Sequence, residues 1–152
     1  MNHRLGLCVL GALLLVNSPA HAHGGFTRDV STATASAHYL VSADGSDGSI
    51  GIGYREGFMG VIGLGILADL DYRFDRSALD ARLGFDLWIA FWGVRSDLIL
   101  RHDVTDHDTR VGAALGAEMI LSRTTIFYAG ANMFPGAPPE GVFGLTWMLD
   151  GL

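Results

Sequence analysis

The densest group of side chains able to bind a metal ion lies in one short polar stretch in the second half of the chain. It comprises His102, Asp103, Asp106, His107 and Asp108. Imidazole nitrogens and carboxylate oxygens are common protein ligands of divalent cations. The stretch predicts a divalent-cation site in a loop; the alternative is a solvated acidic loop that attracts Mg²⁺ or Ca²⁺ without a fixed geometry. We expect no other cofactor.

Serine and histidine together could supply a nucleophile and its base. Ser96 and His102 fall on the same side of one predicted strand, but they lie about 20 Å apart at about 3.3 Å per residue. A nucleophile and its base must approach within about 3 Å. Ser36 and His38 are closer, but they fall on the side that we assign to the interior, where no acyl chain would reach. We therefore expect no catalytic residue and no enzymatic activity.

A larger group of reactive side chains consists of arginines and carboxylates that recur at alternate positions. The chain contains no lysine. Charges removed from water must be paired, and the planar guanidinium group of arginine can bind a carboxylate at two points. The sequence therefore predicts an interior ion-pair network formed by Arg55, Asp69, Asp71, Arg73, Asp80, Arg82, Asp86, Arg95, Asp97, Arg101, Arg110 and Glu118.

These charges must be positioned by β-strands, because apolar residues alternate with glycine or polar residues along most of the chain. The alternation is clearest at residues 62–74. A period of two places successive side chains on opposite faces of a strand. The pattern predicts eight strands, at residues 32–43, 49–56, 59–74, 79–90, 93–103, 109–121, 124–134 and 141–149.

The connections between these strands are of two kinds that take turns along the chain. Polar, acidic or Pro/Gly-rich loops are expected at 43–49, 75–78, 103–108 and 135–140, and tight turns at 56–58, 91–93 and 122–124. Alternating loops and tight turns are typical of an antiparallel up-and-down barrel in a membrane. No run after the first 22 residues approaches the roughly 20 apolar residues of a spanning helix.

The two faces of the strands differ in a way that predicts which one contacts lipid. One face carries the charges and many glycines, which suit the narrow interior of a barrel. The other carries no charge, and its aromatic residues gather near strand ends, such as Tyr39 and Tyr72 toward the loops and Phe91 and Trp92 toward the turns. Aromatic girdles of this kind mark membrane interfaces. Because side chains fill the interior of an eight-stranded barrel, we expect a plugged lumen.

The first 22 residues predict a signal peptide, with a basic start at Arg4, an apolar stretch and small residues at Ala20 and Ala22. Cleavage would follow one of these two alanines. We expect a short periplasmic segment at 23–30 and a barrel domain at 31–152. Removing Arg4 leaves nine arginines against sixteen acids, a net charge of about −7. That charge argues against nucleic acid as a partner.

With these features, residues 31–149 resemble the small bacterial outer-membrane β-barrel proteins typified by the OmpA transmembrane domain and OmpX. The resemblance implies an all-β, eight-stranded antiparallel up-and-down transmembrane β-barrel in the outer membrane of a Gram-negative-type cell. It also implies a structural or interaction role in the cell envelope, with outer-membrane lipid, lipopolysaccharide and the barrel-assembly machinery as partners. Two alternatives stay open: a soluble periplasmic β-barrel that binds a small apolar ligand, and a lipid A-modifying outer-membrane enzyme.

Overall fold

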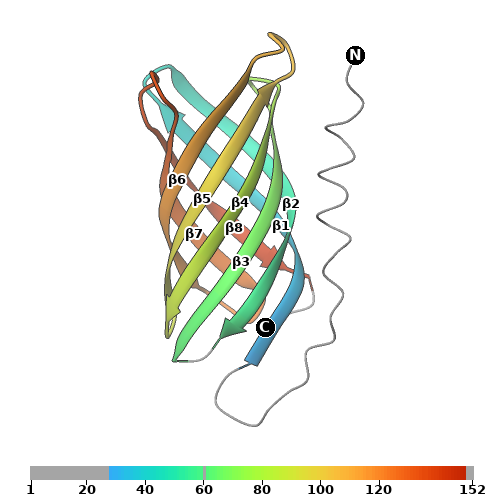
Figure 1. The fold of residues 1–152 in the computed structure, drawn as a ribbon, viewed down its shortest axis with the longest axis vertical. Helices are drawn as coiled ribbons and strands as arrows, with labels where there is room; N and C mark the ends of the chain where they lie inside the picture. Colours follow the sequence, from blue (N-terminus) through green and yellow to red (C-terminus); the bar gives the residue numbers. More distant parts are fainter. Residues whose placement is uncertain (1–27, 60, 150–152) are drawn as a thin grey trace.

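The computed structural model describes residues 28–59 and 61–149, which fold into a single antiparallel barrel (Figure 1). Its strands are β1 (Arg28–Ser42), β2 (Gly45–Met59), β3 (Ile62–Arg73), β4 (Ala78–Ile89), β5 (Trp92–Asp103), β6 (Thr109–Ile120), β7 (Thr125–Met133) and β8 (Glu140–Met148). No helix of the described residues is long and apolar enough to cross a membrane.

Each strand pairs with its neighbours in the sequence, and β1 closes the barrel against β8. The closing register pairs His38 with Gly144 and Tyr39 with Phe143. We call the end that carries the connections 43–44, 74–77, 104–108 and 134–139 the loop end, and the opposite end the turn end. The first residues of β1 and the last of β8 lie at the turn end (Figure 1). The fold is therefore the predicted eight-stranded up-and-down barrel.

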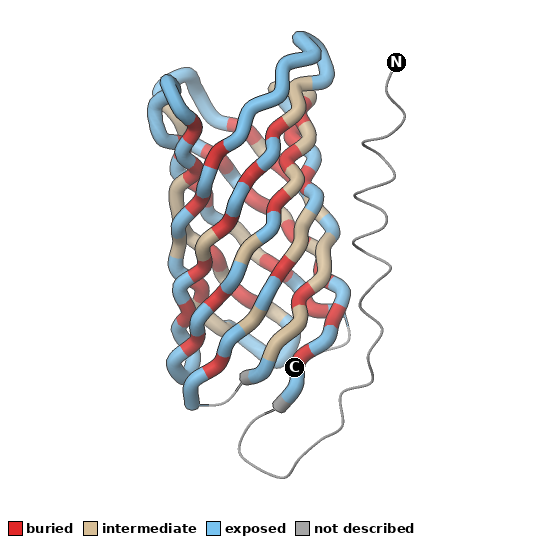
Figure 2. The backbone as a smooth tube through the Cα atoms, in the orientation of Figure 1, coloured by how far each residue is buried: buried red, intermediate tan, exposed pale blue. Residues whose placement is uncertain are grey.

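The alternation of residue types becomes an alternation of burial along each strand (Figure 2). In β5, the outward Val94, Leu98 and Leu100 are exposed, whereas Arg95 and Asp97 are buried. Successive side chains of a strand point to opposite faces, so a closed sheet separates them into an inside and an outside. This barrel therefore buries its charged residues and exposes its apolar ones.

Apolar side chains also enter the interior, where they form three small groups. Trp88, Ile126 and Met148 pack together toward the turn end. Two further groups lie toward the loop end: Leu40, Tyr128 and Val142, and Ile99, Ala114 and Phe134. The charged residues occupy the space between these groups, so the interior is a packed core of mixed polarity.

The first two strands are longer than predicted. β1 begins at Arg28, inside the segment 23–30 that we expected to precede the barrel, and β2 begins at Gly45 rather than residue 49. The connection between them is a two-residue turn at Ala43 and Asp44, followed by Gly45 at a φ of 131°. The polar composition of this region suggested a loop, but its polar residues alternate with the strand period. The predicted signal peptide and its cleavage site lie outside the described residues.

Candidate functional site: the charged interior

The charged side chains of the interior are concentrated on one half of the barrel wall. Strands β2 to β5 contribute all five buried arginines among the described residues and most of the buried carboxylates. The opposite half, formed by β6, β7, β8 and β1, adds Glu118 and Glu140 but otherwise presents neutral groups. Those groups include Thr32, Thr34, Ser36, Asn132 and Thr146. The candidate site is the set of contacts that the charged half makes within itself and with these two glutamates.

One set of contacts lies toward the loop end. We call it the loop-end cluster, and it consists of Arg73, Arg76, Arg82, Arg101, Asp47, Asp71, Asp80 and Glu140. Glu140 is its centre, because its carboxylate accepts hydrogen bonds from Arg73 and Arg101 at 2.9–3.2 Å and from Arg76 at 3.4 Å. One carboxylate thus joins three guanidinium groups.

The other arginine contacts of the loop-end cluster are equally close. Arg73 donates through Nε to Asp47 at 2.9 Å. Arg101 donates to both oxygens of Asp80, at 2.7 and 2.8 Å. Arg82 lies deeper, with its Nε 2.9 Å from Asp71 Oδ2. Each arginine of this cluster therefore has a carboxylate within ion-pair distance. The Arg82–Asp71 pair lacks hydrogen-bond geometry, whereas Arg73, Arg76 and Arg101 donate charge-assisted hydrogen bonds, which are among the stronger contacts in proteins.

A second set of contacts extends from the middle of the barrel toward the turn end. We call it the turn-end cluster, and it consists of Arg55, Arg95, Asp69, Asp86, Asp97 and Glu118. Arg55 donates through one nitrogen to both oxygens of Glu118, at 2.7 and 2.9 Å. Arg95 donates to Asp69 at 2.6 Å and to both oxygens of Asp97 at 2.9 Å. A longer contact of 3.7 Å between Arg82 and Asp97 links the two clusters.

Aromatic rings lie against the arginines of both clusters. The Arg55 guanidinium carbon is 5.7 Å from the ring centre of Trp88, and that of Arg101 is 4.1 Å from the ring centre of Phe134. Cations attract the faces of aromatic rings, more strongly when both are removed from water. The rings therefore supplement the ion pairs and join the charged clusters to the apolar groups.

Two hollows lie in or against the barrel wall. The smaller one, beside Arg55, Asp86 and Trp88, is also lined by the outward-facing Phe58 and Leu64 and has a volume of about 10 Å³, which is close to the minimum for one water molecule. The larger hollow, of about 490 Å³, is open to the outer surface and is lined by residues such as Leu98, Val111 and Met133. Of these two hollows, the larger faces outward and the smaller is close to the size of one water molecule.

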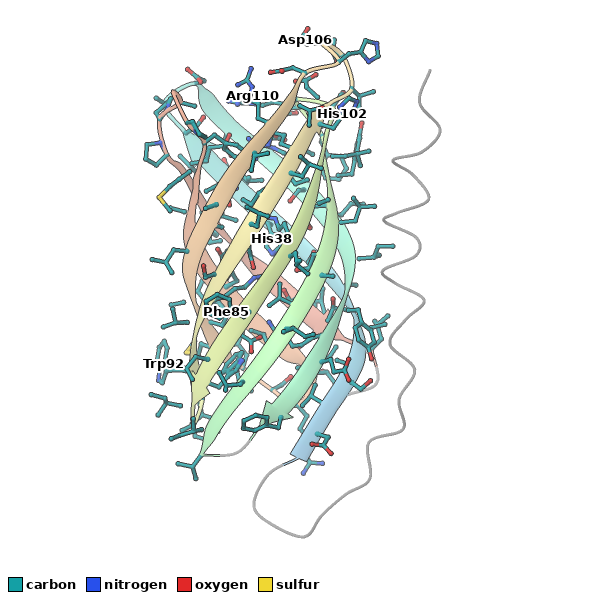
Figure 3. The ribbon with its side chains drawn as sticks, in the orientation of Figure 1. His38, Phe85, Trp92, His102, Asp106 and Arg110 are labelled. Carbon is teal, nitrogen blue, oxygen red and sulfur yellow. The ribbon has the colours of Figure 1, made fainter. Side chains whose placement is uncertain are left out.

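Eleven of the twelve residues predicted for the ion-pair network belong to these two clusters, and Arg110 does not. Its side chain is 62% exposed, and the contact that the described residues give it is an ion pair with Asp108 at 2.6 Å. Figure 3 shows Arg110 at the loop end. The last pair between β6 and β7 joins Ala113 to Met133, so Arg110 stands above the wall with no strand opposite it on that side. The prediction for Arg110 was wrong. The alternation predicts which face of the strand a side chain lies on, but it does not show where the neighbouring strand ends.

Sequence reasoning missed Asp47 and Glu140, which the predicted boundaries placed within the loops 43–49 and 135–140. Both are buried and both bind arginines. The sequence did contain a signal for Asp47. The polar Asp47 and Ser49 alternate with Gly48 and Ile50, as the two faces of a strand do. Glu140 occupies the first position of β8, where no preceding alternation exists to identify its direction.

The predicted metal ligands His102, Asp103, Asp106, His107 and Asp108 lie at the loop end but do not form a ligand set. Figure 3 shows His102 and Asp106 at this end. The described residues contain no group of three or more His, Cys, Asp or Glu side chains placed to hold a metal ion. Asp103 instead accepts the backbone N–H groups of Thr105 and Asp106, and Asp108 binds Arg110. The metal-site prediction is therefore not supported by the geometry: the carboxylates stabilise the loop conformation.

The serine and histidine pairs show no catalytic arrangement. Ser36 donates its hydroxyl hydrogen to Asp71 at 3.0 Å, not to His38. His38 lies inside the barrel with Nδ1 3.7 Å from Asp71, and neither ring nitrogen has a hydrogen-bond partner within the described structure (Figure 3). His102 contacts Thr109 at the loop end. Neither pair has the hydrogen bond between nucleophile and base that covalent catalysis uses.

Comparison with known proteins identifies the fold and not a family. No protein-family model matches the chain, and no curated protein matches its sequence. Two solved structures are similar in fold, each with a TM-score of 0.53. The first comes from the "De novo design of transmembrane beta-barrels", and the second is the solution NMR structure of the de novo designed TMB2.3. Their identities are 11% and 13%; both matches cover 78% of this chain, and 95% and 94% of the designed chains.

Proposed function

We propose that this protein is an outer-membrane β-barrel whose ion-paired interior is closed to solutes, and that its role in the cell envelope is structural or interactive. The observation that carries the proposal is the inverted polarity of the barrel. Charged side chains such as Arg73 and Asp80 are 1% exposed, whereas Ile52 is 69% and Leu83 is 64% exposed. A soluble protein rarely exposes an apolar surface that surrounds the whole molecule.

The outer surface has the further features expected of a barrel in lipid. The outward positions of β3 and β4 are apolar throughout, from Ile62 to Tyr72 and from Leu79 to Ile89. Aromatic pairs flank this band at the loop end, with Tyr39 against Phe143 and Tyr72 against Phe74. Phe91 and Trp92 are exposed at the turn end. Aromatic girdles at both ends of an apolar band are typical of membrane barrels.

The soluble alternative is disfavoured by the same contacts. A periplasmic barrel that binds an apolar ligand needs an apolar cavity, but the described interior holds two charged clusters and a cavity of about 10 Å³. A porin is disfavoured for the same reason, since packed guanidinium and carboxylate groups leave no water-filled passage. Catalysis on lipid A has no nucleophile and base in contact to support it.

The first experiment is to express the full chain with its own N-terminal segment and to isolate the outer-membrane fraction. We expect the protein in that fraction, with a gel mobility in SDS that changes on boiling because a closed barrel resists detergent until heated. Lipopolysaccharide and the barrel-assembly machinery are the partners we propose, and crosslinking in that fraction tests both. Recovery from the soluble periplasm with no heat-dependent shift would contradict the proposal.

A matched pair of variants tests which surface contacts lipid. Leu83 lies in the middle of β4, where it is paired with Ala68 and Leu98, and Val61 lies in the turn between β2 and β3. Arginine on a lipid face costs about 2–4 kcal/mol at the bilayer midplane and little near the interface. We expect L83R to reduce membrane insertion strongly and V61R to have little effect. Equal tolerance of both would favour a soluble barrel.

Planar-bilayer recording tests the closed interior. We expect the wild-type protein to give no stable conductance. A porin recorded in the same bilayer is the positive control. Steady channel activity of the wild-type protein would refute closure while leaving the membrane location intact.

A further inference from the structure

The two clusters differ in their balance of charge. The loop-end cluster has four arginines and four carboxylates, which are Arg73, Arg76, Arg82, Arg101, Asp47, Asp71, Asp80 and Glu140. The turn-end cluster has two arginines and four carboxylates, which are Arg55, Arg95, Asp69, Asp86, Asp97 and Glu118. With every group ionised, the eight residues of the loop-end cluster sum to zero and the turn-end cluster has a charge of −2. Asp44, 3.7 Å from Arg76, adds a negative charge at the loop end, but its side chain is 72% exposed and solvated by water.

Three of the four carboxylates of the turn-end cluster are almost completely removed from water, and the fourth, Asp69, is 11% exposed. The side chains of Glu118 and Asp97 are 0% exposed, and that of Asp86 is 1% exposed. A buried ion without a counter-ion is strongly unfavourable, and a carboxyl group in that position takes up a proton instead of remaining charged. The one link to another arginine is the 3.7 Å contact between Asp97 and Arg82, which already binds Asp71.

Asp86 has the fewest contacts of these carboxylates. Its Oδ2 atom is 3.2 Å from Arg55 Nε, but the pair does not have hydrogen-bond geometry, and both atoms are buried without a hydrogen-bond partner among the described residues. The other carboxylates of both clusters each accept at least one hydrogen bond. Asp86 also lines the cavity of about 10 Å³ that lies beside Arg55.

Asp86 and Glu118 share a single guanidinium group. Glu118 occupies one terminal nitrogen of Arg55 through both of its oxygens, and Asp86 lies against Nε of the same side chain. The neighbouring cation is Arg95, with NH1 3.6 Å from Glu118, but Arg95 already binds Asp69 and Asp97. Two carboxyl groups that share one cation in a buried site compete for the same positive charge.

The remaining titratable and charged groups around the pair do not supply the missing positive charge. On β7, the Tyr128 ring lies 5.4 Å from the Arg95 guanidinium carbon and is itself neutral. On β1, His38 lies higher in the barrel, beside Asp71. On β3 and β5, the groups that face the pair are Asp69 and Asp97, which add negative charge.

We propose that the turn-end cluster is a proton-binding site in which Asp86 and Glu118 together hold one proton at neutral pH. The site takes a proton rather than a metal ion, because the described residues offer no group of three or more carboxylate or imidazole ligands in a coordinating arrangement. The adjacent cavity, of about 10 Å³, is close to the minimum size for one water molecule, and such a water would carry the proton to and from the pair. This inference depends on the buried contacts and not on the proposed membrane location.

Infrared spectroscopy of the full chain, purified in detergent at neutral pH, tests the proposal directly. A protonated buried carboxyl group gives a carbonyl stretching band that moves in heavy water. We expect this band in the wild-type protein and its loss in D86N and in E118Q, because neutralising either partner leaves the other ionised beside Arg55. D80N is the matched control, since Asp80 is buried to the same extent in the balanced cluster. The band should persist in D80N.

The outcomes separate the proposal from its rivals. Absence of the band from the wild-type protein, or its persistence in both D86N and E118Q, would overturn the proposal. A melting temperature that rises with NaCl but not with choline chloride, in a protein that lacks the band, would show that a sodium ion balances the charge instead. D86N replaces the carboxyl group by an amide of the same shape, so we expect it to fold as the wild-type protein does.

Discussion

The loop-end and turn-end clusters use the same two kinds of side chain inside the same barrel, but they distribute positive charge differently. At the loop end, one carboxylate, Glu140, is shared by Arg73, Arg76 and Arg101. At the turn end the relation is reversed, because one arginine, Arg55, lies between the two carboxyl groups of Asp86 and Glu118. The comparison shows that an interior lined with ion pairs can still have more carboxylates than arginines in one region. The inferred protonation follows from this local excess of negative charge.

The surroundings of the clusters differ in the same sense. Arg76 is partly exposed at the loop end, with 39% of its side chain accessible, so water reaches the edge of that cluster. The turn end is covered by Trp88, Ile126 and Met148, which are almost completely buried. In the cluster with the surplus of carboxylates, Asp86 and Glu118 are at most 1% exposed, which raises the free-energy cost of leaving their charges unpaired.

The largest expected effect comes from removing the cation that holds two carboxylates at the turn end. R95M leaves Asp69 and Asp97 without their arginine. Breaking a buried pair by removing one partner typically costs about 3–5 kcal/mol. We expect a loss of that size in the free energy of unfolding, measured by urea titration in detergent micelles. R110M is the control, because Arg110 is exposed. An equal loss of unfolding free energy in both variants would show that the buried ion pairs stabilise the protein no more than the exposed pair does.

At the loop end, the corresponding test is E140Q, which removes the carboxylate shared by three arginines. Hydrogen bonds to charged groups contribute about 1.5–3 kcal/mol each, and the amide of glutamine keeps part of this bonding. We therefore expect a destabilisation of about 2–3 kcal/mol, smaller than that of R95M. The same urea titration measures this loss. A variant as stable as the wild-type protein would show that the bonds to Glu140 do not stabilise the loop-end cluster.

The pair D80N and D86N separates the two clusters most sharply. Asp80 accepts two hydrogen bonds from Arg101, whereas Asp86 accepts none among the described residues. Weakening a charged hydrogen-bonded pair costs about 1–2 kcal/mol, so we expect this loss in D80N. If Asp86 shares a proton with Glu118, replacing its carboxyl group by an amide in D86N should change the free energy of unfolding by less than about 0.5 kcal/mol. Greater destabilisation by D86N than by D80N would contradict the inferred difference between the clusters.

The smallest effect is expected outside the barrel wall. Asp108 and Arg110 form an exposed pair at 2.6 Å, and exposed ion pairs contribute about 0–1 kcal/mol. We expect D108N to change the free energy of unfolding by no more than that, and the change to shrink at high salt. A calorimetric titration of the wild-type protein with Zn²⁺ and Ca²⁺ should give no saturable heat; saturable heat that disappears in D108N would restore the metal-site prediction.

Much of this arrangement could be predicted from particular residues. The alternation at Ile62, Leu64 and Ile66 predicted a strand and its outer face, and all three side chains are exposed. The inward direction of Asp71, Arg82 and Arg95 followed from the same period. Prediction failed at two strand ends. Asp47 follows the strand period, but the polar composition around it suggested a loop, whereas Glu140 is the first residue of β8 and has no preceding alternation to identify its direction.

The sequence by itself determined that there would be strands, which side chains share a face, and that arginines and carboxylates would share the inner one. These properties are local, since a two-residue period depends only on successive backbone positions. Only the tertiary structure decided the partners. Arg55 meets Glu118 from 63 residues away, and Arg73 meets Glu140 from 67 residues away. Such pairs depend on the register at which β1 closes on β8. In a closed barrel, side chains at the same height along the barrel axis come into contact, however far apart they lie in the sequence.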